Sequence, residues 1–140
     1  MICIIRISGQ VGLKKEIVET LNRLRLKRKY SCVVLNPSEK NLGMIKKVRD
    51  FVAFGELSDV DFENLIKARG QPIEKSKKID AKDAVEKIKK GKKYEELNLK
   101  PFFRLHPPRG GIESKKHFGV GKGVLGDNKA DINKLLERMF

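Results

Sequence analysis

The feature that most constrains the fold of this 140-residue chain is the stretch 20–52. In it, apolar residues recur at fixed offsets, and the positions between them are almost all Lys, Arg or Asn. The pattern predicts the end of an amphipathic helix, a short strand, a loop at Pro37, a second short helix and the beginning of another strand. A small α/β unit with a strongly positive exterior follows from this alternation.

The flanking residues extend this unit to a β-α-β-α-β core over residues 1–57. The first strand is rich in β-branched residues and is expected to be buried on most sides. Leu13, Ile17, Leu21 and Leu24 occupy one face of the first helix. The expected elements are a strand at 1–7, a helix at 11–26, a strand at 30–35, a helix capped by Asn41 and a strand at 51–54.

Residues 58–140 form a second region, a helical and irregular C-terminal extension. We expect a helix from Ser58 or Asp59 to Arg69, and a second one that Asp80 caps. The segment 101–126 contains three Pro and six Gly and has no clear period. Asp127 is expected to begin a closing helix that reaches Met139.

The charge balance points to a polyanionic partner. The chain has 32 Lys and Arg against 18 Asp and Glu, a formal net charge of +14. Residues 1–57 carry 12 basic and 5 acidic side chains, and residues 101–126 carry 5 and 1. Such an excess binds nucleic acid through release of counterions. Nucleic acid is therefore the first candidate partner, and an anionic membrane surface is the second.

The candidate RNA-binding residues are the basic side chains outside the apolar faces of the core and those spaced through the Gly/Pro-rich segment 101–126. Cations neutralise phosphates, glycine lets the backbone approach them, and aromatic rings stack on unpaired bases. The alternatives are a solvated helix face for the core cations and an ordinary loop for 101–126, whose Phe102, Phe103 and Phe118 fit base stacking and core packing equally. The candidates are Lys14, Lys15, Arg23, Arg25, Lys27, Arg28, Lys29, Lys46, Lys47, Arg49, Arg104, His106, Arg109, Lys115, Lys116, His117 and Lys122.

No residue pattern predicts catalysis, a cofactor or a metal. His106 and His117 lie eleven residues apart without a Cys or a close carboxylate pair, which is poor spacing for a metal site. Cys3 and Cys32 fall in strand-like runs and are expected to be buried, reduced thiols. A disulfide between them requires that their strands be neighbours. No apolar run approaches the ~20 residues that cross a bilayer, so we expect a soluble, cytoplasmic protein.

Twelve positions carry a resemblance to a known family. The sequence resembles the universal large-subunit ribosomal protein thirty in its long archaeal and eukaryotic form. The core matches its signature, and residues 104–111 with Lys115 and Lys116 look like the C-terminal half of the long form. The signature positions are Thr20, Leu21, Leu24, Leu26, Arg28, Ser31, Val33, Met44, Ile45, Val48, Phe51 and Val52.

The resemblance implies a ferredoxin-like α+β fold with a three-stranded, mostly antiparallel sheet and two helices on one face. It also implies a non-catalytic role in the large ribosomal subunit, with contacts to 23S-type rRNA. The 5S rRNA and neighbouring ribosomal proteins are further implied partners, and no membrane or small-molecule substrate is expected. Two rival functions remain at this point, an enzyme of RNA metabolism and a protein that binds anionic membrane surfaces.

Overall fold

The computed structural model describes residues 1–9 and 11–140, and it places the strand β1 (Ile2–Arg6) inside the sheet. β1 pairs antiparallel with β2 (Ser31–Leu35) on one side and with β3 (Val52–Glu56) on the other. Ile4 lies opposite both Val33 and Phe54. The predicted β-α-β-α-β core and its antiparallel sheet are therefore confirmed.

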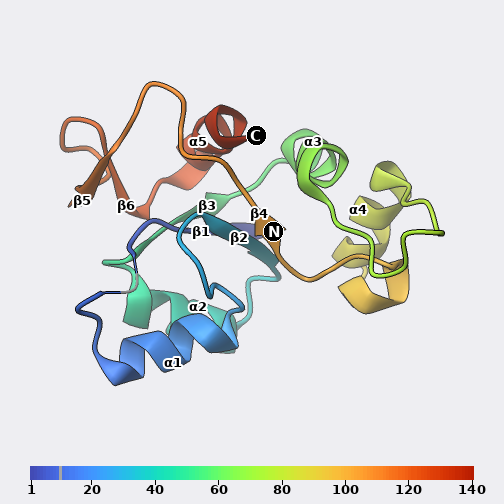
Figure 1. The fold of residues 1–140 in the computed structure, drawn as a ribbon, viewed down its shortest axis with the longest axis horizontal. Coiled ribbons are helices and arrows are strands. Elements are labelled where there is room, and N and C mark those ends of the chain that lie inside the picture. The colour runs from blue at the N-terminus through green and yellow to red at the C-terminus, as the bar shows by residue number, and fades with distance from the viewer. Residues whose placement is uncertain (10) are drawn as a thin grey trace.

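Two helices cover one face of this sheet, as expected. They are α1 (Lys15–Arg23) and α2 (Glu39–Val48), and both lie below the sheet in Figure 1. Because successive side chains of a strand point to opposite faces, Ile4 packs on this side with Leu21 and Val48. Cys3 and Ile5 belong to the hydrophobic core on the opposite side.

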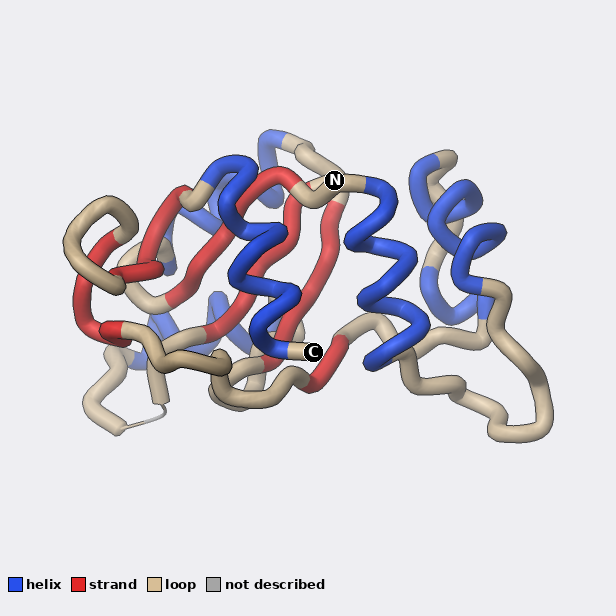
Figure 2. Tube along the Cα trace, turned by 90° about the horizontal axis from the view of Figure 1, so that it is seen from above, coloured by secondary structure: helices blue, strands red, loops and turns tan. Residues whose placement is uncertain are grey.

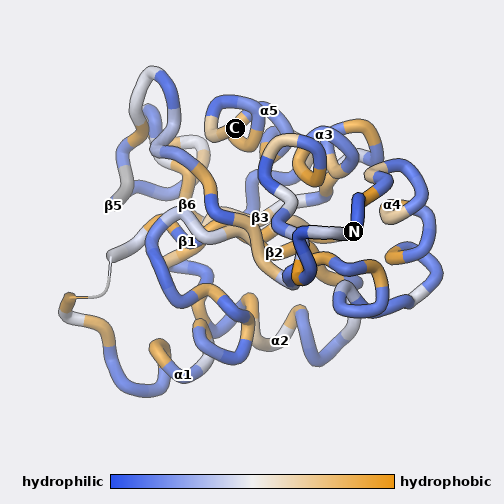
Figure 3. Tube along the Cα trace, turned by 45° about the vertical axis from the view of Figure 1, so that its right-hand side comes forward, coloured by the Kyte–Doolittle hydropathy of each residue, from blue (hydrophilic) through white to orange (hydrophobic). Residues whose placement is uncertain are grey.

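The extension covers the opposite face. Figure 2 shows α5 (Ile132–Met139) lying across the strands, α3 (Asp59–Arg69) next to it beside the strands, and α4 (Ala81–Lys89) beyond α3. The short 3-10 helix η1 (Tyr94–Leu97) follows α4. Phe62 and Leu136 are fully buried against the sheet residues of this core. In Figure 3 hydrophobic stretches lie along the central strands, whereas the edge strand β5 is hydrophilic.

The sheet is larger than the expected three strands. Its order is β4-β2-β1-β3-β6-β5, in which β4 is Phe103–Arg104, β5 is Glu113–His117 and β6 is Gly123–Asp127. β4 pairs antiparallel with β2, whereas β6 pairs parallel with β3 and β5 pairs parallel with β6. The expectation that residues 101–126 are irregular is therefore wrong in part. The segment contributes to three strands, and its buried Phe103, Val124 and Leu125 pack in the core.

Three predicted helix starts are wrong. The first helix is expected over 11–26, but α1 spans only Lys15–Arg23, because Lys14 is extended and Arg25 has a positive φ of 64°. Local hydrogen bonds and the length of β6 explain the other two. Asn41 does not cap α2: its backbone N–H donates to Ser38 Oγ at 3.2 Å, so Ser38 is the cap. α5 begins at Ile132 and not at Asp127, because β6 continues to Asp127 and the 3-10 turn η2 (Lys129–Asp131) follows it. Of the two caps expected for α3, Ser58 and Asp59, the structure has Ser58, and the cap expected at Asp80 is confirmed.

Cys3 and Cys32 are buried, free thiols on neighbouring strands, with 3.4 Å between their Sγ atoms. Burial raises the pKa of the Cys32 thiol, and contact with Cys3 acts in the same direction. The hydroxyl of Tyr94 lies nearby and donates to the carbonyl oxygen of Val34 at 2.7 Å. The expectation of buried, reduced cysteines is confirmed.

Arg6 is the buried cation of β1, and its contacts account for its burial. Its guanidinium donates to the carbonyl oxygens of Leu26, Ser8 and Gly9 at 2.7, 3.1 and 3.2 Å. Burial lowers the pKa of this group. Since its donors are used inside the protein, Arg6 ties the end of β1 to the chain after α1.

The division of the chain into a 1–57 domain and a 58–140 extension stays a prediction. One hydrophobic core joins Cys3, Ile5 and Val34 of the first region to Phe62 and Leu136 of the second. Within the described residues, none of the helices combines the length and the apolar character needed to span a membrane.

Candidate nucleic-acid interface

The side chains of all seventeen candidate residues are exposed. Ten belong to the core: Lys14 immediately precedes α1, and the others lie on α1, on α2 and in the connections that follow these helices. The other seven lie on β4, on β5 and in the loops around them. Exposure makes each of them available to a partner, but their positions relative to one another decide whether they form a surface.

The pairing of β4 with β2 joins cations of the core to a cation of the extension. Arg104 lies opposite Ser31 in this ladder. It lines a pocket of about 300 Å³ together with Arg25, Lys27 and Arg28 from the loop between α1 and β2. Three cations of one loop and a fourth from a distant part of the sequence therefore converge at this edge of the sheet, and we call them the β2-edge cluster.

Phe102 supplies an apolar wall to the same pocket. The ring is half-buried against the core under α1 and α2, and the Arg104 guanidinium carbon lies 5.7 Å from its centroid. Such a distance is within the range of a cation–π contact. The Phe102 ring therefore stabilises the position of the Arg104 guanidinium at the wall of the pocket. Phe103 is fully buried, so core packing accounts for that ring.

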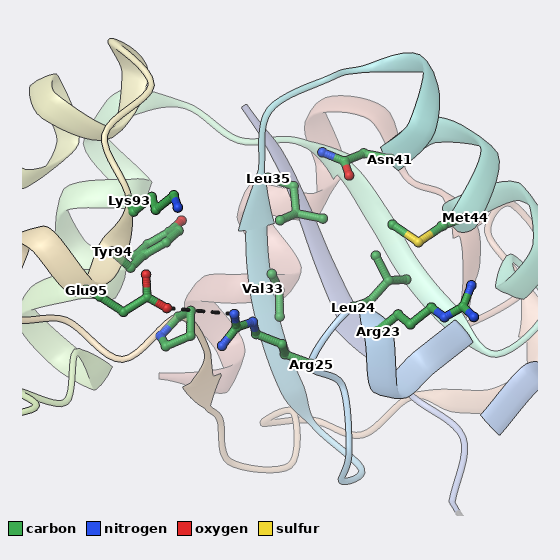
Figure 4. Close-up of a pocket in the computed structure, with 11 residues that line it drawn as sticks. Arg23, Leu24, Arg25, Val33, Leu35, Asn41, Met44, Lys93, Tyr94 and Glu95 are labelled. Atoms are coloured by element: carbon green, nitrogen blue, oxygen red, sulfur yellow. Dashed lines mark ion pairs between the residues drawn. The ribbon is translucent and has the colours of Figure 1, made fainter. Parts of the chain in front are cut away.

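A second pocket, of about 390 Å³, adjoins the β2-edge cluster through Arg25 (Figure 4). Leu24, Leu35 and Met44 line its apolar side. Figure 4 shows Tyr94 and Glu95 facing them from the segment after α4. Arg25 forms an ion pair with Glu95 at 3.7 Å, and both side chains are about half exposed, at 56% and 50%. This cation therefore has an intramolecular partner that competes with any bound phosphate.

A third pocket lies between the β5–β6 connection and α5. It measures about 590 Å³, and its lining includes Arg109 and Lys122, with Lys134 and Arg138 of α5. The Nε of Arg138 donates to the carbonyl oxygen of Arg109 at 2.8 Å, and its Nη2 donates to that of Gly111. Arg138 thus fixes the turn that carries Arg109. We call this pocket the α5 groove.

The strand β5 presents Lys115, Lys116 and His117 at the outer edge of the sheet. The Nε2 of His117 lies 3.3 Å from Asp50 Oδ1, in the turn between α2 and β3. This contact attaches the edge strand to the core. Lys116 Nζ lies 3.4 Å from the carboxylate of Glu113 on the same strand.

The remaining candidates are not brought into these pockets. Lys14 and Lys15 begin α1, whereas Arg23 ends it, and a nine-residue helix separates them by roughly 13 Å. Lys46, Lys47 and Arg49 lie at the C-terminal end of α2, where positive charge also complements the helix dipole. His106 lies in the loop after β4, and its backbone N–H donates to the Met139 carbonyl at 2.9 Å.

Sequence reasoning did not select three cations that line these pockets, Lys93, Lys134 and Arg138. Lys93 belongs to a run of lysines that resembles a solvated helix end, and Lys134 and Arg138 lie on a short helix that also carries the acidic Glu137. Only the folded chain brings them beside Arg25 and Lys122. In the part of the chain that the structure describes, no three His, Cys, Asp or Glu side chains gather in a way that could hold a metal ion.

Comparison with known proteins identifies the family. The sequence profile of "Ribosomal protein L30p/L7e" matches residues 2–52. The "Large ribosomal subunit protein uL30" of Methanococcus maripaludis (strain C5) is 37% identical over 151 residues, which cover 98% of this chain and 97% of that protein. The protein of the same name from Methanosphaera stadtmanae is 37% identical over 153 residues and covers 100% of both chains. The Archaeoglobus fulgidus protein is 34% identical and covers 99% of both. With relatives this similar over nearly its full length, the chain belongs to the ribosomal protein L30p/L7e family.

Proposed function

We propose that this protein is a structural constituent of the large ribosomal subunit that binds 23S-type rRNA through the basic side chains described above. The observation that carries the proposal is the convergence of Arg25, Lys27, Arg28 and Arg104 in one pocket. Its family membership makes it a non-catalytic ribosomal protein, which works on the ribosome in the cytoplasm. Contacts with 5S rRNA and with neighbouring ribosomal proteins are part of the proposal.

The arrangement suits recognition by shape and charge. Cations lie at the sheet edge, in the α5 groove and at helix ends. In an A-form RNA helix the bases are inaccessible in a deep major groove, so the phosphates are what such cations can contact. No enzymatic reaction is needed for this role, and a membrane surface would not require cations that converge from separate parts of the chain. The family assignment supports the ribosomal role over both rivals.

A salt titration of binding tests the proposal. We expect the protein to bind an archaeal 23S-type rRNA transcript with an affinity that falls linearly on a log–log plot, by about 0.9 per duplex phosphate contacted. Vesicles of phosphatidylserine serve as the comparison. Binding to these vesicles as tight as to the rRNA, at equal salt, would contradict the proposal.

Glu95→Gln should strengthen RNA binding. The substitution removes the carboxylate charge that pairs with Arg25, so the guanidinium becomes fully available to a phosphate. We expect the affinity at 0.1 M salt to rise severalfold and the salt slope to steepen by up to about 0.9, the value of one further contact. Folding stability should change by less than about 1 kcal/mol, because exposed ion pairs contribute little.

The matched control is Glu63→Gln, which removes a carboxylate paired with Lys67 at 2.9 Å on α3. Both variants lose one negative charge. If Glu63→Gln improves RNA binding as much as Glu95→Gln, the gain reflects net charge alone, and Arg25 has no special place at the interface.

A further inference from the structure

Phe118 differs from the other aromatic residues of the chain. The sequence contains seven Phe and two Tyr. Phe118 is 41% exposed, and Val120, two residues later, is 55% exposed. The other eight rings pack in or against the two hydrophobic cores: Tyr30, Phe51, Phe54, Phe62, Tyr94, Phe102, Phe103 and Phe140.

The loop that carries Phe118 is held in place by several contacts. The backbone N–H of Phe118 donates to the Leu125 carbonyl at 2.9 Å, and that of Lys122 donates to Glu113 Oε2 at 3.2 Å. Gly121 has a φ of +54°, and a Cβ on it would lie 2.7 Å from the same carboxylate oxygen. The Glu113 carboxylate therefore fills the inside of the loop, so the fold displays the Phe118 side chain at the surface.

The surroundings of the ring are cationic. Phe118 lines the α5 groove, to which Arg109, Lys122, Lys134 and Arg138 contribute positive charge. Asp131 is the acidic residue of this lining, and it lies 3.9 Å from Lys134 Nζ. An apolar protein segment would leave these cations without counter-charges. A nucleotide supplies both a flat apolar base for the ring and a phosphate for the cations.

We infer that the α5 groove binds an unpaired nucleotide of the RNA, with its base stacked on Phe118 and its phosphate beside Lys122 and Arg109. The inference rests on the proposed function and adds a base contact to it. The nucleotide must be unpaired, because bases inside an A-form helix present no free face to a side chain. Phe118 is thus a specificity element in an interface otherwise made of phosphate contacts.

Because the chain has no tryptophan, Phe118→Trp introduces a single fluorescent reporter at the proposed stacking position. Addition of the 23S-type rRNA of Methanococcus maripaludis should quench the emission of this variant, since a stacked base quenches an indole. The control is Ile73→Trp, at a position 48% exposed in the segment between α3 and α4, whose emission should hardly change.

Phe118→Ala provides the second measurement. Stacking contributes roughly 1–3 kcal/mol per base, so the affinity should fall about 5- to 150-fold with no change in the salt slope. Lys122→Ala should instead reduce the slope by about 0.7, the single-strand value for one contact. Thermal unfolding of Phe118→Ala should match that of the wild type, since this side chain lies outside both cores.

The outcomes separate this inference from the proposed function. Wild-type binding, together with unquenched emission of the Phe118→Trp variant and unchanged affinity of Phe118→Ala, would overturn the inference and leave the proposed function intact. Failure of the wild type to bind the rRNA would overturn both. Quenching by a purified neighbouring ribosomal protein, with none by the rRNA, would assign the ring to a protein contact and reject the nucleotide.

Discussion

Replacing Arg25, Arg28 and Arg104 together with alanine is expected to lower the affinity for 23S-type rRNA by roughly 10²- to 10³-fold at 0.1 M salt. Each duplex phosphate contact changes the salt slope by about 0.9, which corresponds to a factor of about 8 between 1 M and 0.1 M salt. For three lost contacts these factors multiply to a loss of affinity of about 500-fold, within the expected range. The slope itself should fall by about 2.7.

The effect is large because these residues act at one place. The β2–β4 ladder positions Arg104 beside the loop that carries Arg25 and Arg28, so one stretch of RNA backbone can contact all three. The side chains are exposed, and the variant should therefore fold normally. Filter binding over a series of salt concentrations measures both the affinity and the slope.

The control removes three cations from another part of the surface. Lys75, Lys77 and Lys78 lie in the polar segment between α3 and α4 and are all exposed. Their triple alanine variant has the same net charge as the first, but we expect it to lose far less affinity. Equal losses in the two variants would mean that the protein binds RNA through its overall charge and has no defined surface.

Phe103→Ala is expected to cost about 3–5 kcal/mol of the free energy of unfolding, as large-to-small substitutions of buried aromatics do. Phe103 is fully buried, pairs with Cys32 in the β2–β4 ladder and packs edge-on against Tyr94, with ring centroids 6.3 Å apart. Since whole proteins are stable by only about 5–15 kcal/mol, this loss leaves little margin. Urea unfolding measures it.

The same substitution should also weaken RNA binding, because β4 carries Arg104 next to Phe103. A loosened β4 no longer holds that guanidinium beside the core cations. Phe118→Ala removes an equal ring from the surface and should leave the unfolding free energy nearly unchanged. A loss of less than about 1 kcal/mol for Phe103→Ala, well below the usual cost of such a cavity, would show that the extension does not depend on this anchor.

The core of the fold was predictable because its periodicities are strong. The β-branched residues of β1 and the apolar Ile17 and Leu21 of α1 reflect elements that are buried on one or both sides. The strands of 101–126 lack such a signal for a physical reason. β4 has two residues, and β5 lies at the exposed edge of the sheet, so neither needs an apolar alternation.

Sequence reasoning identified most of the cations but could not join those of the extension to those of the core. Exposure follows from the apolar pattern, because charged side chains avoid the buried face of each helix. The neighbourhood of Arg25 and Arg104 depends on the pairing of strands from distant parts of the chain, and no local pattern encodes that pairing. The same limit applies to Phe118. The residues around it in the sequence fit base stacking and core packing equally, and only the folded structure shows that this ring lies outside both hydrophobic cores.

The burial of β1 between two layers has a consequence for synthesis. Residues 2–6 leave the translating ribosome early, yet their Cys3 and Ile5 side chains pack in the same core as Leu135 and Leu136 of α5. Until that helix has been translated and released, this side of the sheet lacks the part of its cover that α5 supplies. The nascent chain therefore exposes an aggregation-prone apolar surface, which a chaperone would have to cover while elongation continues.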